Sequence, residues 1–347
     1  MGKNVRLILK DNVLGVLSES ELNTVSSVFY NGGFCRTRAI INTEVPVTYG
    51  DRRLHDDPKA FVLTAAKKLG VPSDFVGMVT AAKIKNFSLV KKKKGELRVC
   101  VIATAGCSHS ESAGEKIDVE EIEGTINVIV IVDADPTESC LVATLATVVE
   151  AKAAAMRDLD IRSRYTGDSA TGTITDSIVV AATNRGPKMI LGGPPSELGQ
   201  LVGNSVRQAV MEAITKQGEC LLSRSVLDRL RERHLSVEKL ASELCKLKSL
   251  DTGEGALNSR LSLILKTPFS ASVVMAAVKL DDDLVKGLVP AELRETGVLA
   301  RHFGGLLNRV AVKETELKTV NLPPFLREVL VALLKSEVPK GKSESLK

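Results

Sequence analysis

Two short apolar runs in the middle of the chain, each entered from a polar segment that contains glycine, restrict the folds open to it. Val128–Val132 and Ile178–Ala182 are rich in β-branched residues and are bounded by polar residues, as buried strands are. Between them, Ser139–Leu159 has the length of a helix and is apolar through its first three turns. A strand, a helix and a strand in this order are typical of α/β proteins.

The part of the chain before these runs is dominated by strand patterns. We predict strands at Val5–Leu9, Val13–Leu17, Thr24–Tyr30, Ile40–Val47, Phe75–Ala82, Phe87–Val90 and Leu97–Ala103. One helix is expected after Asp57-Pro58, because aspartate caps a helix and proline fits its first turn. Since several strands follow one another, hairpins are expected, and the predicted fold class is α/β with a mixed sheet covered by helices.

Beyond Gly218 the pattern changes to helices alone. Leu221–Leu247 and Leu261–Leu334 carry apolar residues at spacings of three and four, with interruptions at prolines. We therefore predict a helical C-terminal extension over residues 218–338 and a charged, disordered tail over residues 339–347. The extension contains no motif that carries chemistry. It is expected to be an accessory or dimerising region, and a homo-oligomer stays an open alternative.

Composition argues against several classes of protein. Of the 347 residues, 44% are hydrophobic and 26% charged, which is ordinary for a globular protein. No apolar run reaches the length of a membrane span and the N-terminus lacks a signal-peptide pattern, so a cytoplasmic location is expected. The net charge of +5 is mild, aromatic residues make up 3%, and Lys91–Lys94 fits an exposed hairpin tip. No nucleic-acid partner is predicted.

The candidate site is centred on Gly167–Ser177. This segment carries two carboxylates and several hydroxyl groups, and it leads directly into the second apolar run. Gly167 and Gly172 have the spacing of a phosphate-binding loop, but Thr173 occupies the position of that motif's lysine, so the motif is absent. A polar loop at the mouth of a buried strand is a common place for a binding or catalytic site.

Two further residues invite a functional interpretation. Glu150 stands in the apolar helix, where a carboxylate must find a partner or have its pKa raised. A buried ion pair and a catalytic role are both open for it. His109 lies two residues from Cys107, but the sequence has no second closely spaced pair of ligands and no Cys-x-x-Cys pair among its six cysteines. No metal site is therefore predicted, and reduced thiols are expected.

Six short motifs in series carry a family resemblance. They are Asn31–Gly33, Gly77–Ala82, Thr104–Gly106, Gly124–Asn127, Glu150–Lys152 and Thr171–Ser177. Each motif is weak alone, but their series resembles the adenosylcobinamide amidohydrolase family of archaeal corrinoid salvage. The resemblance covers roughly the first two thirds of the chain, and it indicates an amidohydrolase-like catalytic domain over residues 1–217.

The resemblance implies hydrolysis of the aminopropanol amide of adenosylcobinamide, which gives adenosylcobyric acid and 1-amino-2-propanol for cobalamin synthesis. The corrinoid is then the substrate, and no cofactor is implied. Asp176 and Glu150 are expected to divide the acid and base work, with Thr173 at the oxyanion. A water molecule activated by a carboxylate is the first choice of nucleophile, and the hydroxyl of Thr125 is the second. The expected substrate-binding residues are Asn127, which would orient the amide, and Asn31, Thr104, His109, Thr171 and Gly172.

Two other functions stay open on the sequence alone. The same loop could hold a corrinoid or a nucleotide without converting it, as a non-enzymatic binding module. A small-molecule kinase is a further alternative, against which the missing phosphate-loop lysine argues. Product formation separates the enzyme from the binding module, and dependence on ATP identifies a kinase.

Overall fold

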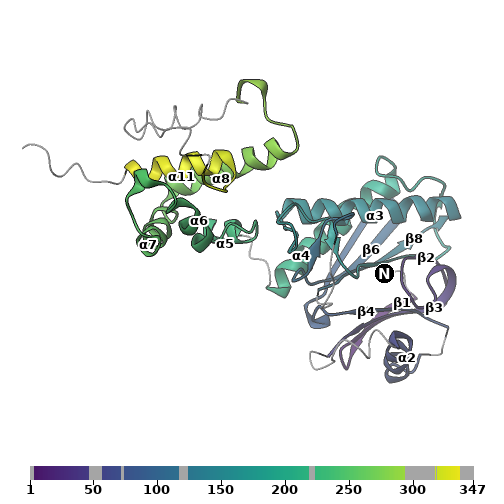
Figure 1. Cartoon of the computed structure of the whole chain (residues 1–347). Helices are drawn as coiled ribbons and strands as arrows, with labels where there is room; N and C mark the ends of the chain where they lie inside the picture. The colour runs from purple at the N-terminus through teal and green to yellow at the C-terminus, as the bar shows by residue number, and fades with distance from the viewer. Residues whose placement is uncertain are drawn as a thin grey trace, which may run out of the picture. The chain divides into compact units, whose positions relative to one another are not determined.

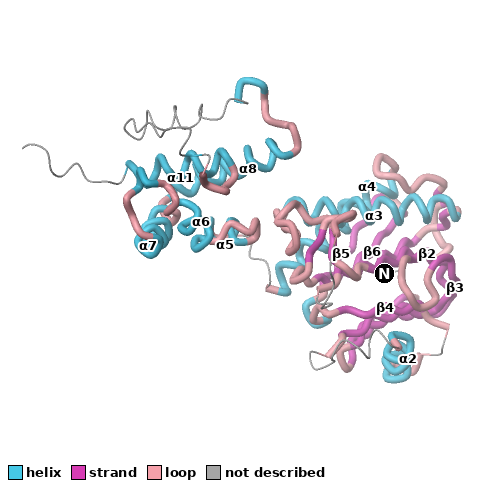
Figure 2. Tube along the Cα trace, viewed as in Figure 1, coloured by secondary structure: helices cyan, strands magenta, loops and turns pink. Residues whose placement is uncertain are grey.

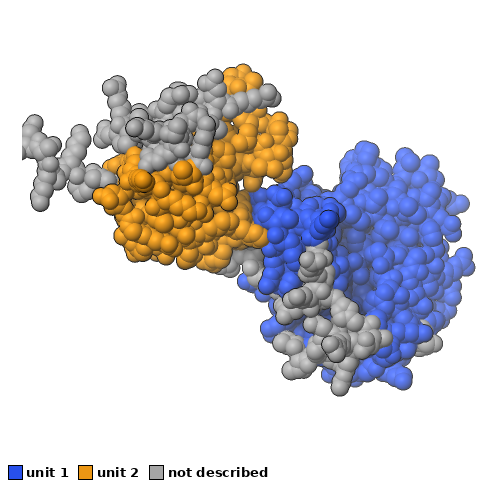
Figure 3. Space-filling view, in the orientation of Figure 1, with its two compact units in different colours: residues 1–222 blue, residues 223–347 orange. Residues whose placement is uncertain are grey.

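The computed structural model of the chain describes residues 4–46, 57–71, 74–116, 124–218, 223–293, 317 and 319–336. The chain divides into two compact units, residues 1–222 and 223–347, shown in different colours in Figure 3. Each unit is built around its own hydrophobic core. The candidate site lies in the first unit.

An eight-stranded mixed sheet forms the framework of the first unit, in the order β4-β3-β2-β11-β8-β6-β5 with β1 paired to β2. The strands are β1 (Val5–Lys10), β2 (Val13–Ser26), β3 (Gly33–Glu44), β4 (Val76–Thr80), β5 (Ser88–Lys94), β6 (Leu97–Ala105), β8 (Ile126–Asp133) and β11 (Ser177–Ala182). Strands β8 and β11 are parallel, with Asn127 opposite Ser177, and the long helix between them makes the crossover connection. The predicted mixed sheet with helices around it is confirmed.

Among the described residues of this unit, three helices cover the sheet (Figures 1 and 2). Helix α3 (Glu138–Asp158) packs on β11 and β2, and α4 (Glu197–Gln217) packs on β5, β6 and β8. Helix α2 (Pro58–Lys68) packs on β3 and β4, which Figure 1 shows on the far side of the sheet from α3. Asp57 caps α2 by accepting a hydrogen bond from Ala60 N, as its position before a proline predicted.

The sheet bends so that its two halves enclose a second layer of core. Along β8, Val128 and Val130 face α3 and α4, whereas Ile129 packs with Ile40 of β3 and Met78 of β4. Strands β3 and β4 are not neighbours of β8 in the strand order, so these contacts require the sheet to curve. The register of β2 against β3 shifts between Leu17 and Leu22, and such an irregularity increases local twist and bending.

Predicted strand boundaries around the β2–β3 turn are wrong: the strand predicted at Ile40–Val47 is β3, which begins at Gly33 and ends at Glu44. The predicted strand at Thr24–Tyr30 does not form as a unit, because β2 ends at Ser26 and the next strand, β3, already begins at Gly33. The chain reverses between them with left-handed backbone at Asn31 (φ 53°) and Gly33 (φ 77°). The apolar residues Val28, Phe29 and Tyr30 continue the strand pattern past the end of β2, whereas the predicted start at Thr24 lies inside β2, which already runs from Val13.

The described part of the second unit consists of helices. They are α5 (Val226–Arg231), α6 (Val237–Leu244), α7 (Glu254–Ile264), α8 (Pro268–Val285) and α11 (Pro324–Ser336), with short 3₁₀ turns at Lys248–Leu250 and Ala291–Leu293. Leu240, Leu261 and Phe325 are among the residues of its core. The predicted helical C-terminal extension is confirmed, whereas the predicted disordered tail at 339–347 lies outside the described residues.

Two parts of the described structure are long and apolar enough to cross a membrane. The first is α3, whose most apolar stretch is half buried against the rest of the unit, as in a core helix of a globular protein. The second is the pair α7 and α8, which meets at an angle of 103°. Both are weak indications of a membrane span, because buried core helices have the same length and composition.

Candidate functional site

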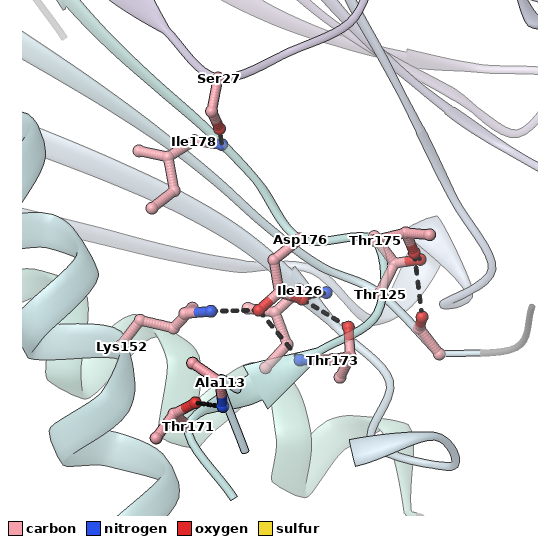
Figure 4. A network of polar contacts seen from close by, with 11 residues as sticks. Ser27, Ala113, Thr125, Ile126, Lys152, Thr171, Thr173, Thr175, Asp176 and Ile178 are labelled. Atoms are coloured by element: carbon pink, nitrogen blue, oxygen red, sulfur yellow. Dashed lines mark hydrogen bonds and ion pairs between the residues drawn. The ribbon is translucent and has the colours of Figure 1, made fainter. Parts of the chain in front are cut away.

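Asp176 lies at the centre of the candidate site, immediately before β11. Its Oδ1 accepts hydrogen bonds from Ile126 N at 2.9 Å and from the Thr173 hydroxyl, and its Oδ2 accepts from Thr173 N at 3.1 Å and from Lys152 Nζ (Figure 4). A carboxylate has about four lone-pair positions, so these four donors occupy them all. Asp176 therefore joins the start of β8, the loop before β11 and helix α3.

Lys152 supplies the positive charge of the site. It comes from α3, its Nζ forms an ion pair with Asp176 Oδ2, and the two side chains are only 10% and 11% exposed. Burial makes an unpaired charge costly, so each of the two residues requires the other. Lys152 was not singled out from the sequence. Its position in the sequence does indicate burial, because Lys152 is four residues from both Val148 and Met156, which are buried on the same face of the helix.

Gly172 and Thr171 shape the loop around this ion pair. A Cβ atom at Gly172 would overlap both Asp176 Oδ2 and Lys152 Nζ, so the close approach of these groups depends on glycine. Strand β10 (Gly172–Thr173) pairs antiparallel with β7 (Ser110–Glu111). Thr171 fastens the same pairing, because its amide donates to Glu111 O at 2.8 Å and its hydroxyl accepts from Ala113 N at 3.0 Å.

The predicted nucleophile Thr125 lies beside this cluster and bonds to another hydroxyl. Its Oγ1 is 2.8 Å from Thr175 Oγ1, and Thr175 Oγ1 lies 3.3 Å from the carbonyl oxygen of Gly124. Gly124 has a left-handed backbone (φ 87°), and a Cβ there would come within 3.1 Å of Gly106 O and His109 N. The segment from Gly106 to His109 therefore packs closely on the start of β8.

Asn127 and Thr104 belong to a second polar cluster, on the inner side of the bent sheet. Asn127 Nδ2 donates to Val79 O at 2.7 Å and to Asn42 Oδ1 at 2.9 Å, and Asn42 Nδ2 donates to Thr104 Oγ1 at 3.0 Å. Asn127 Oδ1 is buried and accepts no hydrogen bond within the described part of the chain. Asn42 was not predicted from the sequence, because strand β3 reaches β8 only through the bend of the sheet.

His109 is 4% exposed, and its Nδ1 has no hydrogen-bond partner among residues 4–46, 57–71, 74–116, 124–218 and the described C-terminal helices. A buried polar atom without a partner is uncommon in proteins and calls for an explanation such as a ligand or a water molecule. No three His, Cys, Asp or Glu side chains in the described residues are grouped to hold a metal ion. The predicted binding role of His109 stays a prediction.

The expectation that Glu150 is buried is wrong. Glu150 is exposed and lines a groove of about 940 Å³ between α3 and α4, beside Asn204 and Gln208. Residues two apart on a helix point in different directions, so Lys152 reaches Asp176 while Glu150 faces away. The apolar composition of α3 was misleading because its outer face also carries apolar residues, with Val149 47% exposed. The structure does not bring Glu150 together with Asp176.

Asn31 is explained by the turn that it forms. Its backbone is left-handed, with φ of 53°, and its Nδ2 donates to Phe75 O at 2.8 Å. Asparagine tolerates this conformation better than most residues, and the side-chain bond ties the β2–β3 turn to the segment before β4. None of these bonds connects Asn31 to Asp176. The substrate contact predicted for Asn31 stays a prediction.

Fold and site together define an α/β protein with a buried lysine–aspartate pair at the point where two parallel strands begin. Its family follows from comparison with known proteins: residues 2–221 match the family model described as adenosylcobinamide amidohydrolase (CbiZ), and the chain belongs to this family. That membership supports an amidohydrolase role.

Two curated relatives match part of this chain. An uncharacterised protein of Methanocaldococcus jannaschii is 29% identical over an alignment of 207 residues, and the alignment covers 53% of this chain and 80% of the relative. A protein of Methanosarcina mazei named adenosylcobinamide amidohydrolase is 26% identical over 220 residues, 61% of this chain and 98% of that protein.

Solved structures are similar only at a low level. A Pyrococcus horikoshii protein aligns with a TM-score of 0.31 at 12% identity, over 62% of this chain and 82% of its own. A β-aminopeptidase of a Burkholderia species aligns with a TM-score of 0.33 at 13% identity, over 66% and 90% of the two chains. Scores at this level support no conclusion about function.

Proposed function

We propose that this chain hydrolyses the amide that joins aminopropanol to the corrinoid in adenosylcobinamide, releasing adenosylcobyric acid and 1-amino-2-propanol. One observation supports this most directly: three family-like motifs that lie far apart in the sequence meet at one carboxylate. Ile126 of the first motif, Lys152 of the second and Thr173 of the third all donate to Asp176. Family membership supplies the substrate class.

Amide hydrolysis needs stabilisation of the oxyanion that forms on the carbonyl oxygen. An ammonium group has three N–H donors, and the described contact with Asp176 uses one donor of Lys152. A second donor is free to bind the developing oxyanion, in a site where low exposure to water strengthens the attraction. We propose that Lys152 stabilises the oxyanion, and that Thr173 lies beside it.

Asp176 has a supporting part in this proposal. Its acceptor positions are already filled, so it is poorly placed to take a proton from water. We assign it to the orientation of Lys152 and Thr173. A water molecule stays the first choice of nucleophile, because the Thr125 hydroxyl bonds to Thr175 rather than to a titratable base.

The test is incubation of the purified full chain with adenosylcobinamide in the absence of ATP, followed by chromatography of the corrinoid and assay of the free amine. We expect adenosylcobyric acid and 1-amino-2-propanol in equal amounts, with and without a chelator. Binding of adenosylcobinamide without any product contradicts the proposal and supports a binding module. Turnover that requires ATP, or that a chelator abolishes and zinc restores, contradicts hydrolysis by Lys152 and a water molecule alone.

The pathway, the cellular location and the roles of the two units belong to the same proposal. A corrinoid as small-molecule substrate follows from the family name, whereas corrinoid salvage, a cytoplasmic location and an archaeal origin are predictions carried over from the sequence. The functional division into a catalytic domain and an accessory helical region, and a homo-oligomeric state, are predictions of the same kind.

A further inference from the structure

Glu111 occupies a position in the site that the sequence motifs do not mark. It lies on β7, directly opposite Gly172 of β10 in the antiparallel register. Side chains of directly opposite residues in an antiparallel pair leave the sheet on the same face, with Cβ atoms about 5 Å apart. The direction that a Cβ atom would take at Gly172 therefore shows on which face of the strand pair the side chain of Glu111 lies.

That direction leads to the ion pair. A Cβ built at Gly172 would overlap Asp176 Oδ2 and Lys152 Nζ, so this face of the β7–β10 pair is the face that carries both charged groups. Glu111 is thus the third charged side chain of the cluster. The charged groups that act on it are Asp176, Glu115 and Lys152.

The carboxylate of Glu111 differs from that of Asp176 in what surrounds it. Asp176 is almost enclosed and accepts four hydrogen bonds, whereas Glu111 is partly exposed and its carboxylate accepts none from the part of the chain that the structure describes. Nearby Glu115 resembles Asp176, because it accepts from Ser112 N, Ser163 and Thr166. Among these three carboxylates, Glu111 has its lone pairs open to a water molecule.

The electrostatic setting is the one that a proton-transfer group needs. Burial raises the pKa of the Glu111 carboxyl, the negative charges of Asp176 and Glu115 raise it further, and Lys152 opposes them. For Glu115, burial also raises the pKa, but the hydrogen bonds from Thr166, Ser112 and Ser163 outweigh it and hold the pKa below the ordinary value. A carboxyl group with a raised pKa is better matched to proton transfer near neutral pH than one with a lowered pKa.

We propose that Glu111 is the general acid–base residue of the amide hydrolysis, an inference that rests on the function proposed above. The Glu111 carboxylate takes a proton from water while the water oxygen bonds to the amide carbon, and the oxyanion that forms is stabilised by Lys152. The carbon–nitrogen bond then breaks, and the proton on Glu111 passes to the leaving nitrogen. Glu111 returns to its carboxylate form, and one water molecule is consumed for each acid and amine produced.

The experiment compares the full-length parent with Glu111→Gln and Glu111→Asp, and with Glu96→Gln as a matched control in the exposed turn between β5 and β6. Parent turnover of adenosylcobinamide is measured first. An inactive parent overturns the proposed function, and this inference with it. With an active parent, Glu111→Gln is expected to lower kcat roughly a hundredfold or more at an unchanged melting temperature. Glu96→Gln is expected to match the parent.

The pH profile separates a proton-transfer role from a structural one. The rate of the parent is expected to fall as the pH drops and Glu111 becomes protonated. Glu111→Asp is expected to keep that fall with a lower maximum, and it serves as the decisive variant if Glu111→Gln does not fold. A rate for Glu111→Gln within threefold of the parent overturns the proposal, and so does a Glu111→Asp profile that has lost the acid limb.

Discussion

Asp176 and Lys152 are held in a place where neither could carry its charge alone. Both side chains are about nine-tenths buried, and no other ion pair is described for either residue. Removing one partner of such a pair leaves the other as an uncompensated buried charge, whereas replacing both by neutral residues is often tolerated. The pair can therefore be tested for its structural and its chemical contribution separately.

We expect Lys152→Met to lower the free energy of unfolding by about 3 kcal/mol, because it leaves Asp176 charged and unpaired. The double variant Lys152→Met/Asp176→Asn should recover most of that loss, while turnover of adenosylcobinamide stays absent. Urea unfolding of Lys152→Met, of Asp176→Asn, of the double variant and of the parent gives the coupling between the two changes. Full additivity of the two changes would show that the residues do not act as a pair.

A substitution at Gly172 tests whether the site depends on the close approach of Lys152 and Asp176. Gly172→Ala is expected to cost about 1–3 kcal/mol and to abolish most turnover, because the added methyl group displaces the ion pair. Gly203→Ala, in the middle of α4, is the matched control. A Cβ there meets Thr147 at an ordinary 3.7 Å, and alanine favours a helix over glycine. Equal turnover in the two variants would contradict the assignment of the site.

At the scale of elements, α3 sets which charges enter the site. Lys152 and Glu150 are two residues apart on α3, so Lys152 points into the site and Glu150 points away from it. The amino-acid composition of the helix does not show which of its faces meets β11. Periodicity did contain the answer in part, since Val148, Lys152 and Met156 share the buried stripe. Within the Glu150–Lys152 motif, Lys152 contacts Asp176 and Glu150 does not, so the catalytic role predicted for Glu150 stays a prediction without support from these contacts.

The pairing of β7 with β10 explains why Glu111 could not be found from the sequence. Its two strands have two residues each and lie about sixty residues apart, and a pattern so short carries no strand signal. The contact of Asn42 with Asn127 is equally hidden, because it joins two strands that are not neighbours in the sheet. The longer strands β6, β8 and β11, by contrast, were predictable from their β-branched runs.

A buried carboxylate also joins two helices of the second unit. Asp281 of α8 accepts hydrogen bonds from Phe325 N at 2.9 Å and Leu326 N at 2.8 Å, so it caps the start of α11 from a neighbouring helix. Burial raises the pKa of Asp281 from 3.8 to about 6, against the lowering effect of these two bonds. The folded chain therefore holds this proton over a pH range in which the unfolded chain has released it.

The sign of the pH effect follows from that difference. Protonation of Asp281 favours the folded state, so its contribution to the unfolding free energy rises as pH falls from 7 to 4, by at most about 3 kcal/mol. Asp281→Asn does not titrate. We expect the difference in unfolding free energy between parent and Asp281→Asn to change over this pH range, measured through hydrogen exchange of α8 and α11. A difference that is constant with pH would contradict the raised pKa.

On the scale of the whole molecule, the family match and the residues of the proposed site both lie in the first unit. The family match ends at residue 221, close to the boundary between the two compact units, and the residues around Asp176 all come from residues 110–177. We expect a chain that ends at residue 222 to retain the turnover of the full chain, measured with adenosylcobinamide under the same conditions. A folded short chain without turnover would show that the helical unit completes the site.

The central claim is that the first unit splits an amide with water, and isotope labelling tests it most directly. The full chain is incubated with adenosylcobinamide in water enriched in oxygen-18, and the corrinoid product is analysed by mass spectrometry. We predict one oxygen-18 atom in the new carboxylate of adenosylcobyric acid, with an equal amount of unlabelled 1-amino-2-propanol. Unchanged adenosylcobinamide, or an acid product without the label, would contradict the account.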